Sequence, residues 1–146
     1  MPDFTALATG GENWRLKDAA GKKVVIYLYP KDMTAGCTRE GQDFRDLAAG
    51  FRKAGTLIVG VSRDSVASHE KFTSKEELPF PLLSDPDEKL CKLFDVIKEK
   101  TLYGRKYFGI ERSTFLLDSK GVLRQEWRKV KVPGHAEEVL EAAKSL

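Results

Sequence analysis

The sequence predicts a three-layer α/β fold with a mixed central sheet, and three observations lead to this prediction. Two continuous apolar runs, Lys22–Tyr29 and Thr56–Ser62, have the composition of buried central strands. A helical pattern follows each of these runs. The last third of the chain then has the pattern strand, tight turn, strand and helix. The full order is therefore β-α-β-α, followed by a hairpin and a closing helix.

The first strand, "KKVVIYLY", precedes a predicted helix that extends from about Cys37 to Lys53. Its small and apolar residues recur at helical spacing, which places them on one face: Cys37, Gly41, Phe44, Ala48 and Phe51. Gly55 stands where a glycine often ends a helix. A loop from Tyr29 to Cys37 thus joins the end of a buried strand to the start of a helix.

The middle of the chain continues with the second strand and a helix over Val66–Leu78, for which Asp64 or Ser65 is the expected N-cap. The segment "PFPLLSDPD", Pro79–Asp87, is expected to be an extended turn region. A short helix over about Glu88–Phe94 carries Cys91.

The C-terminal third is predicted to contain a strand over Arg112–Asp118, a turn at "SKG" and an antiparallel partner, "VLRQEWRKV". The segment "GHAEEVLEAAKSL" then forms a helix whose inward residues are Ala136, Val139, Leu140 and Ala143. In sheets of this kind, ligands bind outside the carboxyl ends of the strands. The Tyr29–Cys37 loop lies at such an end.

Length and composition are those of one globular domain, expected over residues 1–146. The chain is 41% hydrophobic and 32% charged. No run approaches the roughly 20 apolar residues of a membrane span, and no secretory leader is recognisable. We therefore expect a cytoplasmic protein without membrane contact, in a compartment that keeps thiols reduced.

The formal charge of +3 is too small to indicate a nucleic-acid partner. The densest basic stretch, Arg124–Lys131, has the interleaved charges of a solvated strand face, so we expect no nucleic-acid binding. Two histidines and two cysteines, widely separated, do not make a zinc site at the usual spacings. We expect no metal or organic cofactor.

Cys37 is the residue whose context is unusual. A lone cysteine is often a small buried hydrophobe. Here, however, it falls in the first turn of a long helix, where free amides and the helix dipole stabilise an anion. Thiol pKa values fall below about 8.5 at such positions, and the thiolate is the nucleophile. The position therefore favours a reactive thiol over a structural one.

Three further residues are candidates for the same site. The Thr34 hydroxyl, three residues before Cys37, can approach the sulfur or its substrate, and Pro30 offers an apolar wall at the strand end. Arg112 begins a strand of the same predicted sheet. An arginine that points into the pocket would stabilise a thiolate and orient a polar substrate.

These residues resemble a known family. "YPKDMTAGCTRE", Tyr29–Glu40, has the Pro-x-x-x-Thr-x-x-Cys pattern of the peroxiredoxins. The flanking segments resemble the bacterioferritin comigratory protein, or peroxiredoxin Q, subfamily, so that the resemblance covers nearly the whole chain: Pro2–Gly11, Gly60–Ser65, Leu78–Val96 and Tyr103–Gly121.

The resemblance implies a thioredoxin-like fold and a thiol-dependent peroxidase that reduces hydrogen peroxide and organic hydroperoxides. It implies that Cys37 is the peroxidatic cysteine, that Thr34 contacts sulfur and peroxide, and that Pro30 shields the site. Arg112 matches the active-site arginine and Glu40 an acid that helps to hold it. The resemblance also implies a thiol reductant such as thioredoxin, glutaredoxin or a small thiol, and a monomer.

The chain departs from the family pattern in the loop. Met33 and Ala35 stand where the family commonly has Asn and Pro. The loss of a polar side chain and of a rigid φ predicts a looser loop with the chemistry retained. We also expect Met33 to be oxidisable beside a peroxide site.

A second departure concerns the resolving cysteine. The two positions that carry it in different branches are Gln42 and Thr73 here, so only Cys91 remains, 54 residues after Cys37. The resemblance implies that a peroxide converts Cys37 to a sulfenic acid, which a thiol must reduce. Either an external thiol reduces it, or Cys91 resolves it after local unfolding. The apolar neighbours of Cys91 favour a packed structural residue, but a resolving role stays open.

Two other classes share the fold. A thioredoxin-type thiol oxidoreductase requires Cys-x-x-Cys, whereas Cys37 is followed by Thr38, Arg39 and Glu40. A binding or chaperone module without peroxidase activity would not require the set Pro30, Thr34, Cys37 and Arg112. An unreactive Cys37 would favour that module.

Overall fold

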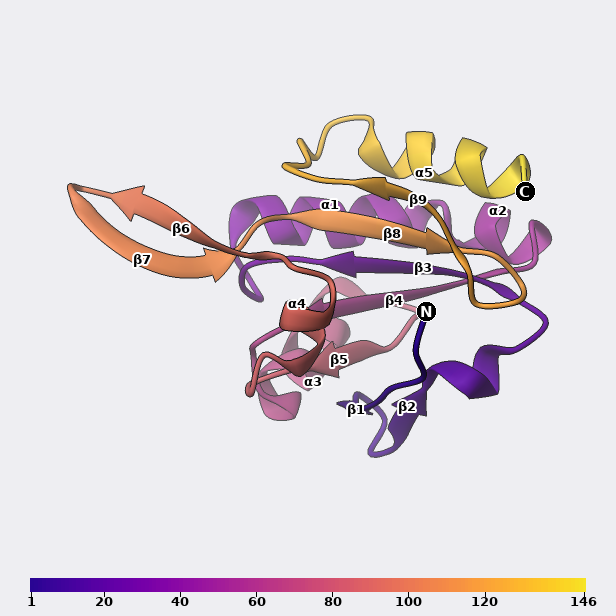
Figure 1. Cartoon of the computed structure of the whole chain (residues 1–146), viewed down its shortest axis with the longest axis horizontal. Helices are drawn as coiled ribbons and strands as arrows, with labels where there is room; N and C mark the ends of the chain where they lie inside the picture. Colours follow the sequence, from indigo (N-terminus) through magenta and orange to yellow (C-terminus); the bar gives the residue numbers. More distant parts are fainter.

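The apolar run after Lys22 forms β3 (Lys23–Leu28), an interior strand of the main sheet. The computed structural model describes all 146 residues (Figure 1). β3 pairs in parallel with β4 (Thr56–Ser62) on one side and antiparallel with β8 (Ser113–Leu117) on the other. Every residue of β3 after Lys23 is buried, as expected for a strand covered on both faces.

The sheet contains seven strands in the order β2-β1-β5-β4-β3-β8-β9. Its strands β3, β4 and β5 are parallel, while the pairs β1–β5, β3–β8 and β8–β9 are antiparallel. The remaining strands are β1 (Thr5–Ala8), β2 (Asn13–Arg15), β5 (Leu82–Ser84) and β9 (Leu123–Trp127). The mixed sheet confirms the predicted fold class.

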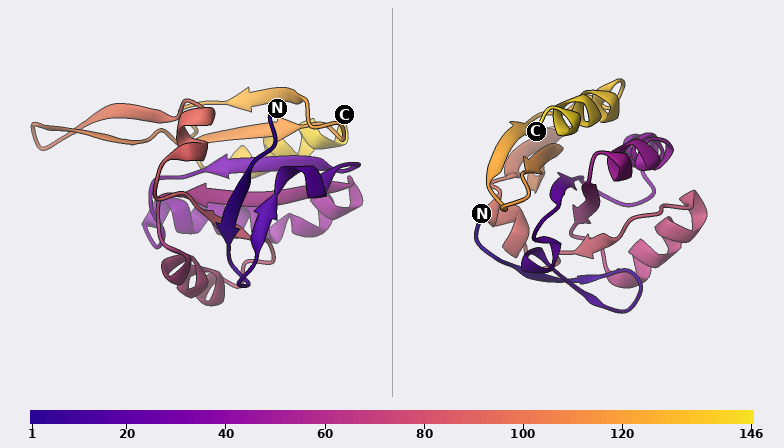
Figure 2. Two further views of the ribbon diagram at one scale, coloured as in Figure 1. Left: turned by 60° about the horizontal axis from the view of Figure 1, so that its bottom comes forward. Right: turned by 90° about the vertical axis from the view of Figure 1, so that its right-hand side faces the viewer.

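Helices cover both faces of this sheet (Figure 2). One face carries the four longer helices: α1 (Ala35–Asp46), α2 (Ala48–Lys53), α3 (Val66–Glu76) and α5 (His135–Lys144). The other face carries α4 (Lys89–Leu93) and the 3₁₀ helix η1 (Leu16–Ala19). The result is the three-layer arrangement that the sequence predicts.

The sheet separates two hydrophobic cores. Successive strand residues point to opposite faces, so Val25 and Tyr27 pack with the core beneath α1, α2, α3 and α5, which contains Cys37. Val24 and Ile26 pack with the core beneath α4, which contains Cys91. The two cysteines therefore lie on opposite sides of the sheet.

A two-stranded hairpin projects from the body (Figure 1). It consists of β6 (Ile97–Leu102) and β7 (Arg105–Ile110), which pair only with each other. Large apolar side chains are exposed on it, among them Leu102, Tyr103 and Phe108. The sequence pattern predicts neither this hairpin nor the strands β1 and β2.

The predicted helix over Cys37–Lys53 is wrong in its extent. It begins earlier, at Ala35, and it is divided into α1 and α2 at Leu47, which takes a non-helical backbone with φ −102° and ψ 3°. The apolar spacing continues across Leu47 because Phe44 and Phe51 are both fully buried in one core. Periodicity alone therefore did not reveal the break.

The segment Pro79–Asp87 is also more ordered than the predicted turn region, because it contains β5. This three-residue strand pairs in parallel with Gly60–Ser62 of β4. On its other edge, Leu83 and Ser84 pair antiparallel with β1. Proline on either side limits the strand to a length that its sequence pattern does not reveal.

Candidate active site

The candidate site lies at the carboxyl end of β3, where the chain turns through Tyr29–Thr34 into α1. This is the edge of the sheet at which α/β folds place their chemistry. Arg112 reaches the same edge by a different route, because β8 is antiparallel to β3 and Ser113 pairs with Leu28. The residue just before β8 must therefore lie next to the end of β3.

Cys37 is the third residue of α1 and is 2% exposed. The extended Thr34 is the N-cap, and its carbonyl accepts the N–H of Thr38 at 2.9 Å in the first intrahelical hydrogen bond. The amides before Thr38 have no intrahelical partner. Cys37 is thus placed in the electropositive first turn, as the sequence predicts, although the helix begins two residues earlier.

Arg112 connects Cys37 to Glu40. Its Nη2 donates to Cys37 Sγ at 3.3 Å, and its Nη1 donates to Glu40 Oε1 at 2.5 Å. Cys37 and Glu40 are neighbours on one face of α1 because they are three residues apart. One guanidinium can therefore contact both side chains, and the structure brings together these three predicted site residues.

The charges in this group are strongly coupled. Burial raises the pKa of Glu40 to about 7, and the Arg112 guanidinium opposes that rise. Burial also disfavours the charged form of Arg112, but the charges of Glu40 and Cys37 outweigh it and raise the Arg112 pKa. Arg112 is thus a permanent cation beside the sulfur.

Thr34 and Pro30 belong to the same loop as Cys37. The Thr34 hydroxyl donates to the carbonyl of Lys31 at 3.0 Å, and Pro30 is half-buried after Tyr29. The predicted role of Thr34 stays a prediction.

Gly36 belongs to the site and was missed by the sequence analysis. A Cβ atom added at this position would lie 3.1 Å from Arg112 Nη2. The absence of a side chain therefore lets the guanidinium lie against the first turn of α1. The only signal in the sequence is a glycine just before Cys37, at a helical position where glycine is less stable than most other residues.

Cys91 lies outside this group. It is fully buried, and its backbone N–H donates to Asp85 Oδ2 at 2.8 Å. Burial, together with the hydrogen bond and the charge of Asp85, raises the pKa of the Cys91 thiol well above its usual range. These surroundings keep it a protonated thiol.

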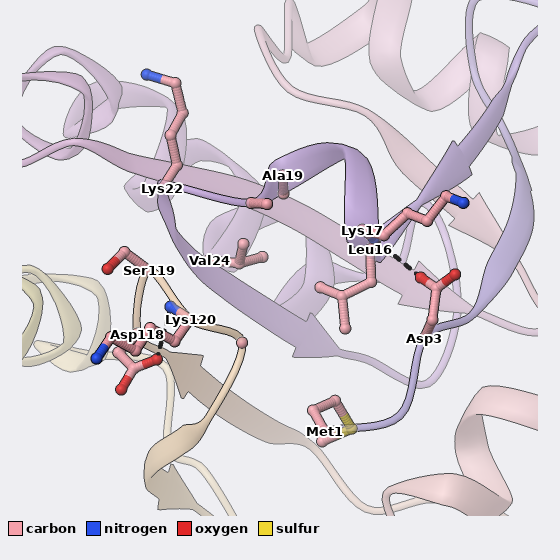
Figure 3. Close-up of a pocket in the computed structure, with 12 residues that line it drawn as sticks. Met1, Asp3, Leu16, Lys17, Ala19, Lys22, Val24, Asp118, Ser119 and Lys120 are labelled. Atoms are coloured by element: carbon pink, nitrogen blue, oxygen red, sulfur yellow. Dashed lines mark hydrogen bonds between the residues drawn. The ribbon is translucent and has the colours of Figure 1, made fainter.

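A surface pocket exists far from Cys37 (Figure 3). It lies at the amino end of β3, next to Lys22 and Val24, whereas Cys37 follows the carboxyl end of that strand. Asp3 in this pocket accepts the N–H of Lys17, and Asp118 accepts the N–H of Lys120. These polar groups serve the local backbone.

No three His, Cys, Asp or Glu side chains are grouped so that they could hold a metal ion. No helix combines the length and the apolar character that crossing a bilayer requires.

Comparison with known proteins identifies the family. Residues 1–126 match the model of the AhpC/TSA family. The chain is 56% identical over 143 residues to peroxiredoxin Bcp of Xanthomonas campestris, covering 98% of this chain and 89% of that protein. It is 50% identical over 145 residues to peroxiredoxin Bcp of Bacillus subtilis, with coverages of 99% and 92%. The chain belongs to the AhpC/TSA family, as a peroxiredoxin.

A solved structure supports both this family assignment and the fold. The bacterioferritin comigratory protein of Xanthomonas campestris superposes with a TM-score of 0.93 at 55% identity, over 97% of this chain and 90% of that one. The predicted thioredoxin-like fold and the subfamily resemblance are both confirmed. Membership of this family favours an enzyme over a binding module.

Proposed function

We propose that this peroxiredoxin reduces hydrogen peroxide and organic hydroperoxides through Cys37. The observation that carries the proposal is the position of Arg112, whose guanidinium contacts both Cys37 Sγ and the Glu40 carboxylate. The Xanthomonas campestris relative is described by its alkyl peroxide reduction activity. An alkyl hydroperoxide therefore belongs among the first substrates to test.

In the proposed reaction, the Cys37 thiolate attacks the terminal oxygen of the peroxide. The S–O bond forms as the O–O bond breaks, and the electron pair of that bond goes to the departing oxygen. This oxygen takes up a proton and leaves as water or an alcohol. The cysteine retains the other oxygen as a sulfenic acid, which a thiol must reduce.

The residues around Cys37 supply charge stabilisation for this step. Negative charge moves from sulfur to the departing oxygen, so a fixed cation and free amide donors lower the barrier. Arg112 is the cation, and the unpaired N–H groups of the first turn of α1 are the donors. In this proposal Thr34 contacts the peroxide, Pro30 shields the sulfur, and Glu40 positions Arg112.

We also propose that an external thiol, such as thioredoxin, glutaredoxin or a small thiol, reduces the sulfenic acid. Two positions carry a resolving cysteine in branches that the chain resembles. Here Gln42 Nε2 donates to Glu76 Oε1 at 2.8 Å, and Thr73 is a half-buried residue of α3 whose hydroxyl oxygen is buried. The first thiol forms a mixed disulfide and releases water, and a second thiol frees Cys37. Such thiols are abundant in the cytoplasm.

The alternative is a two-cysteine cycle with Cys91. It requires Cys91 to leave one core and reach Cys37 in the other, because a disulfide needs Cα atoms within about 7 Å. Its protonated, buried thiol is a poor nucleophile. Both observations favour the external thiol.

The test is intact-mass analysis after one equivalent of hydrogen peroxide or tert-butyl hydroperoxide, with and without a sulfenic-acid trap. Wild type, Cys37→Ser and Cys91→Ser are compared. We expect wild type and Cys91→Ser to form a trapped adduct that maps to residue 37, because Cys37 keeps its surroundings in both. Cys37→Ser should form none.

Two outcomes would count against the proposal. A wild type that loses two mass units, when Cys91→Ser does not, would establish Cys91 as the resolving residue. An absence of any adduct at Cys37 in wild type would remove the peroxidase assignment for this cysteine.

A further inference from the structure

A buried polar cluster lies beside the candidate site and takes no part in the chemistry described above. We define it by Asp32, whose carboxylate is the centre, and by the three side chains that donate to it, Tyr29, Ser68 and His69. Asp32 is the only buried residue between Pro30 and Cys37. Every other residue from Lys31 to Gly36 is exposed, so Asp32 is the buried anchor of this part of the loop.

Both oxygens of the Asp32 carboxylate accept hydrogen bonds from neighbouring side chains. Its Oδ1 accepts the Tyr29 hydroxyl at 2.5 Å, and its Oδ2 accepts the Ser68 hydroxyl at 2.8 Å and His69 Nδ1 at 2.7 Å. The Asp32 backbone N–H donates to Asp64 Oδ2 at 2.9 Å. Burial opposes ionisation of Asp32, but the hydrogen bonds from His69 and Tyr29 prevail and lower its pKa.

His69 is the member that joins this cluster to the rigid sheet. Its side chain is completely buried in α3, and its Nε2 lies 2.9 Å from the carbonyl oxygen of Leu83 in β5. Each ring nitrogen thus lies within hydrogen-bond distance of an oxygen, one in Asp32 and one in Leu83. The ring therefore links the Asp32 carboxylate to β5 of the main sheet, and its hydrogen bond to that carboxylate is charge-assisted.

The loop needs such a link because its backbone is strained next to Asp32. Met33 has φ +64°, a left-handed conformation that a side chain disfavours. Thr34 follows as the N-cap of α1 and Cys37 lies in its first turn. A shift of Asp32 would therefore move the amides and the sulfur relative to Arg112, which is held separately by β8.

We propose that His69 is a positioning residue for the Cys37 reaction: through Asp32 it fixes the active-site loop and the first turn of α1. This inference rests on the proposed function for the reaction it names. It does not make His69 a catalytic residue, since the ring contacts neither sulfur nor peroxide.

The test compares two substitutions that each retain one of the two ring hydrogen bonds. In His69→Asn the side-chain amide can occupy the place of Nδ1 and still donate to Asp32, while the bond to Leu83 is lost. In His69→Gln the longer amide can reach Leu83, while the bond to Asp32 is lost. Both variants lose the ring and one hydrogen bond, so their losses of stability are comparable.

We expect His69→Gln to lower the rate constant of sulfenic-acid formation by about 10- to 100-fold, the scale of a small misplacement of a reacting group. His69→Asn should stay within about threefold of wild type. The alkylation of Cys37 by iodoacetamide, measured against pH, should move to higher pH in His69→Gln only. Equal rates in the two variants, whether both normal or both reduced, would overturn the proposal.

A second pair of variants keeps the test valid if a His69 variant does not fold. Ser68→Ala removes one donor to Asp32, whereas Ser65→Ala removes the N-cap hydrogen bond to the Ser68 amide and leaves Asp32 untouched. We expect only Ser68→Ala to slow the reaction, by roughly two- to fivefold. Equal rates would contradict a positioning role. If wild type forms no sulfenic acid, the proposed function fails, and the alkylation profiles still test the cluster.

Discussion

At the scale of single residues, Gly36 makes the close approach of Arg112 possible. Alanine at this position would place a Cβ atom 3.1 Å from Arg112 Nη2, so the guanidinium would have to move by a few tenths of an ångström. We expect Gly36→Ala to slow sulfenic-acid formation by about 3- to 10-fold, because the Arg112 guanidinium, which stabilises the developing charge, moves away from the sulfur. Stopped-flow kinetics with hydrogen peroxide would measure the effect.

Gly50→Ala is the matched control for Gly36→Ala. Its added Cβ atom would also meet a side-chain atom at 3.1 Å, in this case Leu140 Cδ2 in the core beneath α5. Neither glycine has a positive φ, so neither substitution strains the backbone. A slower reaction in both variants, or in neither, would show that Gly36 has no special relation to Arg112.

Glu40 makes stability depend on pH. Its pKa is about 7 in the folded protein and near 4.5 when unfolded, so the folded state keeps a proton that the unfolded state releases. The contribution of protonated Glu40 to the free energy of unfolding is therefore fully present below about pH 4.5 and is lost as the pH rises through about 7. Full ionisation of the buried carboxyl costs on the order of 3 kcal/mol.

We expect Glu40→Gln to remove this dependence, because the amide has no proton to lose and can still accept from Arg112. Between pH 5 and pH 8, the free energy of unfolding of wild type should fall by roughly 2–3 kcal/mol more than that of Glu40→Gln. Urea unfolding at a series of pH values would measure both. Parallel curves would mean that Glu40 is ionised across the whole range.

Cys37, Glu40 and Arg112 are in contact in the structure. The spacing motif indicated Cys37, the start of a predicted strand indicated Arg112, and the family resemblance indicated Glu40. His69 and Asp32 were not connected in the same way. Their contact joins residues 37 positions apart, and a fully buried histidine has no periodic signal that distinguishes it from a core residue.

At the scale of elements, the hairpin of β6 and β7 is the least supported part of the chain. Its strands pair only with each other, and Tyr103 at its tip is 96% exposed with φ +52°. We expect chymotrypsin to cut first after Tyr103, because exposed turns of this kind are preferred sites of cleavage. Mass spectrometry during limited proteolysis would identify the bond.

The buried tyrosines provide the internal control for this cleavage. Tyr27 and Tyr29 are each 1% exposed, so they should stay uncut until the protein unfolds. The nicked chain should keep the melting temperature of wild type within a few degrees, since no strand of the main sheet is lost. A first cut within the main sheet would show that the body opens before the hairpin.

Elements with a strong sequence pattern of their own could be predicted, whereas elements that depend on their partners could not. β3, β4, α3 and α5 have long apolar patterns or clear caps, such as Ser65, whose hydroxyl accepts the N–H of Ser68. β5 has three residues and depends on both β1 and β4 for its hydrogen bonds. Short strands of this kind are determined by their partners, which a local pattern does not contain.

At the scale of the whole molecule, the predicted order of strands and helices was enough to give the layers and the edge of the sheet that carries the site. It did not give the separation of the two cysteines, because a sequence pattern does not show which face of the sheet each helix covers. The face that each one occupies follows from the side on which α1 and α4 cover the sheet. This separation is the strongest physical argument for an external reductant.

The division of the core by the sheet also determines how freely the protein can change. Distant substitutions that share no partners have additive effects on stability. The core around Cys91 and Phe94 shares no residue with the core beneath α1. Substitutions in the core around Cys91 can therefore accumulate while the surroundings of Cys37 stay constant. The face of the sheet opposite the candidate site is thus the face on which the sequence can evolve more freely.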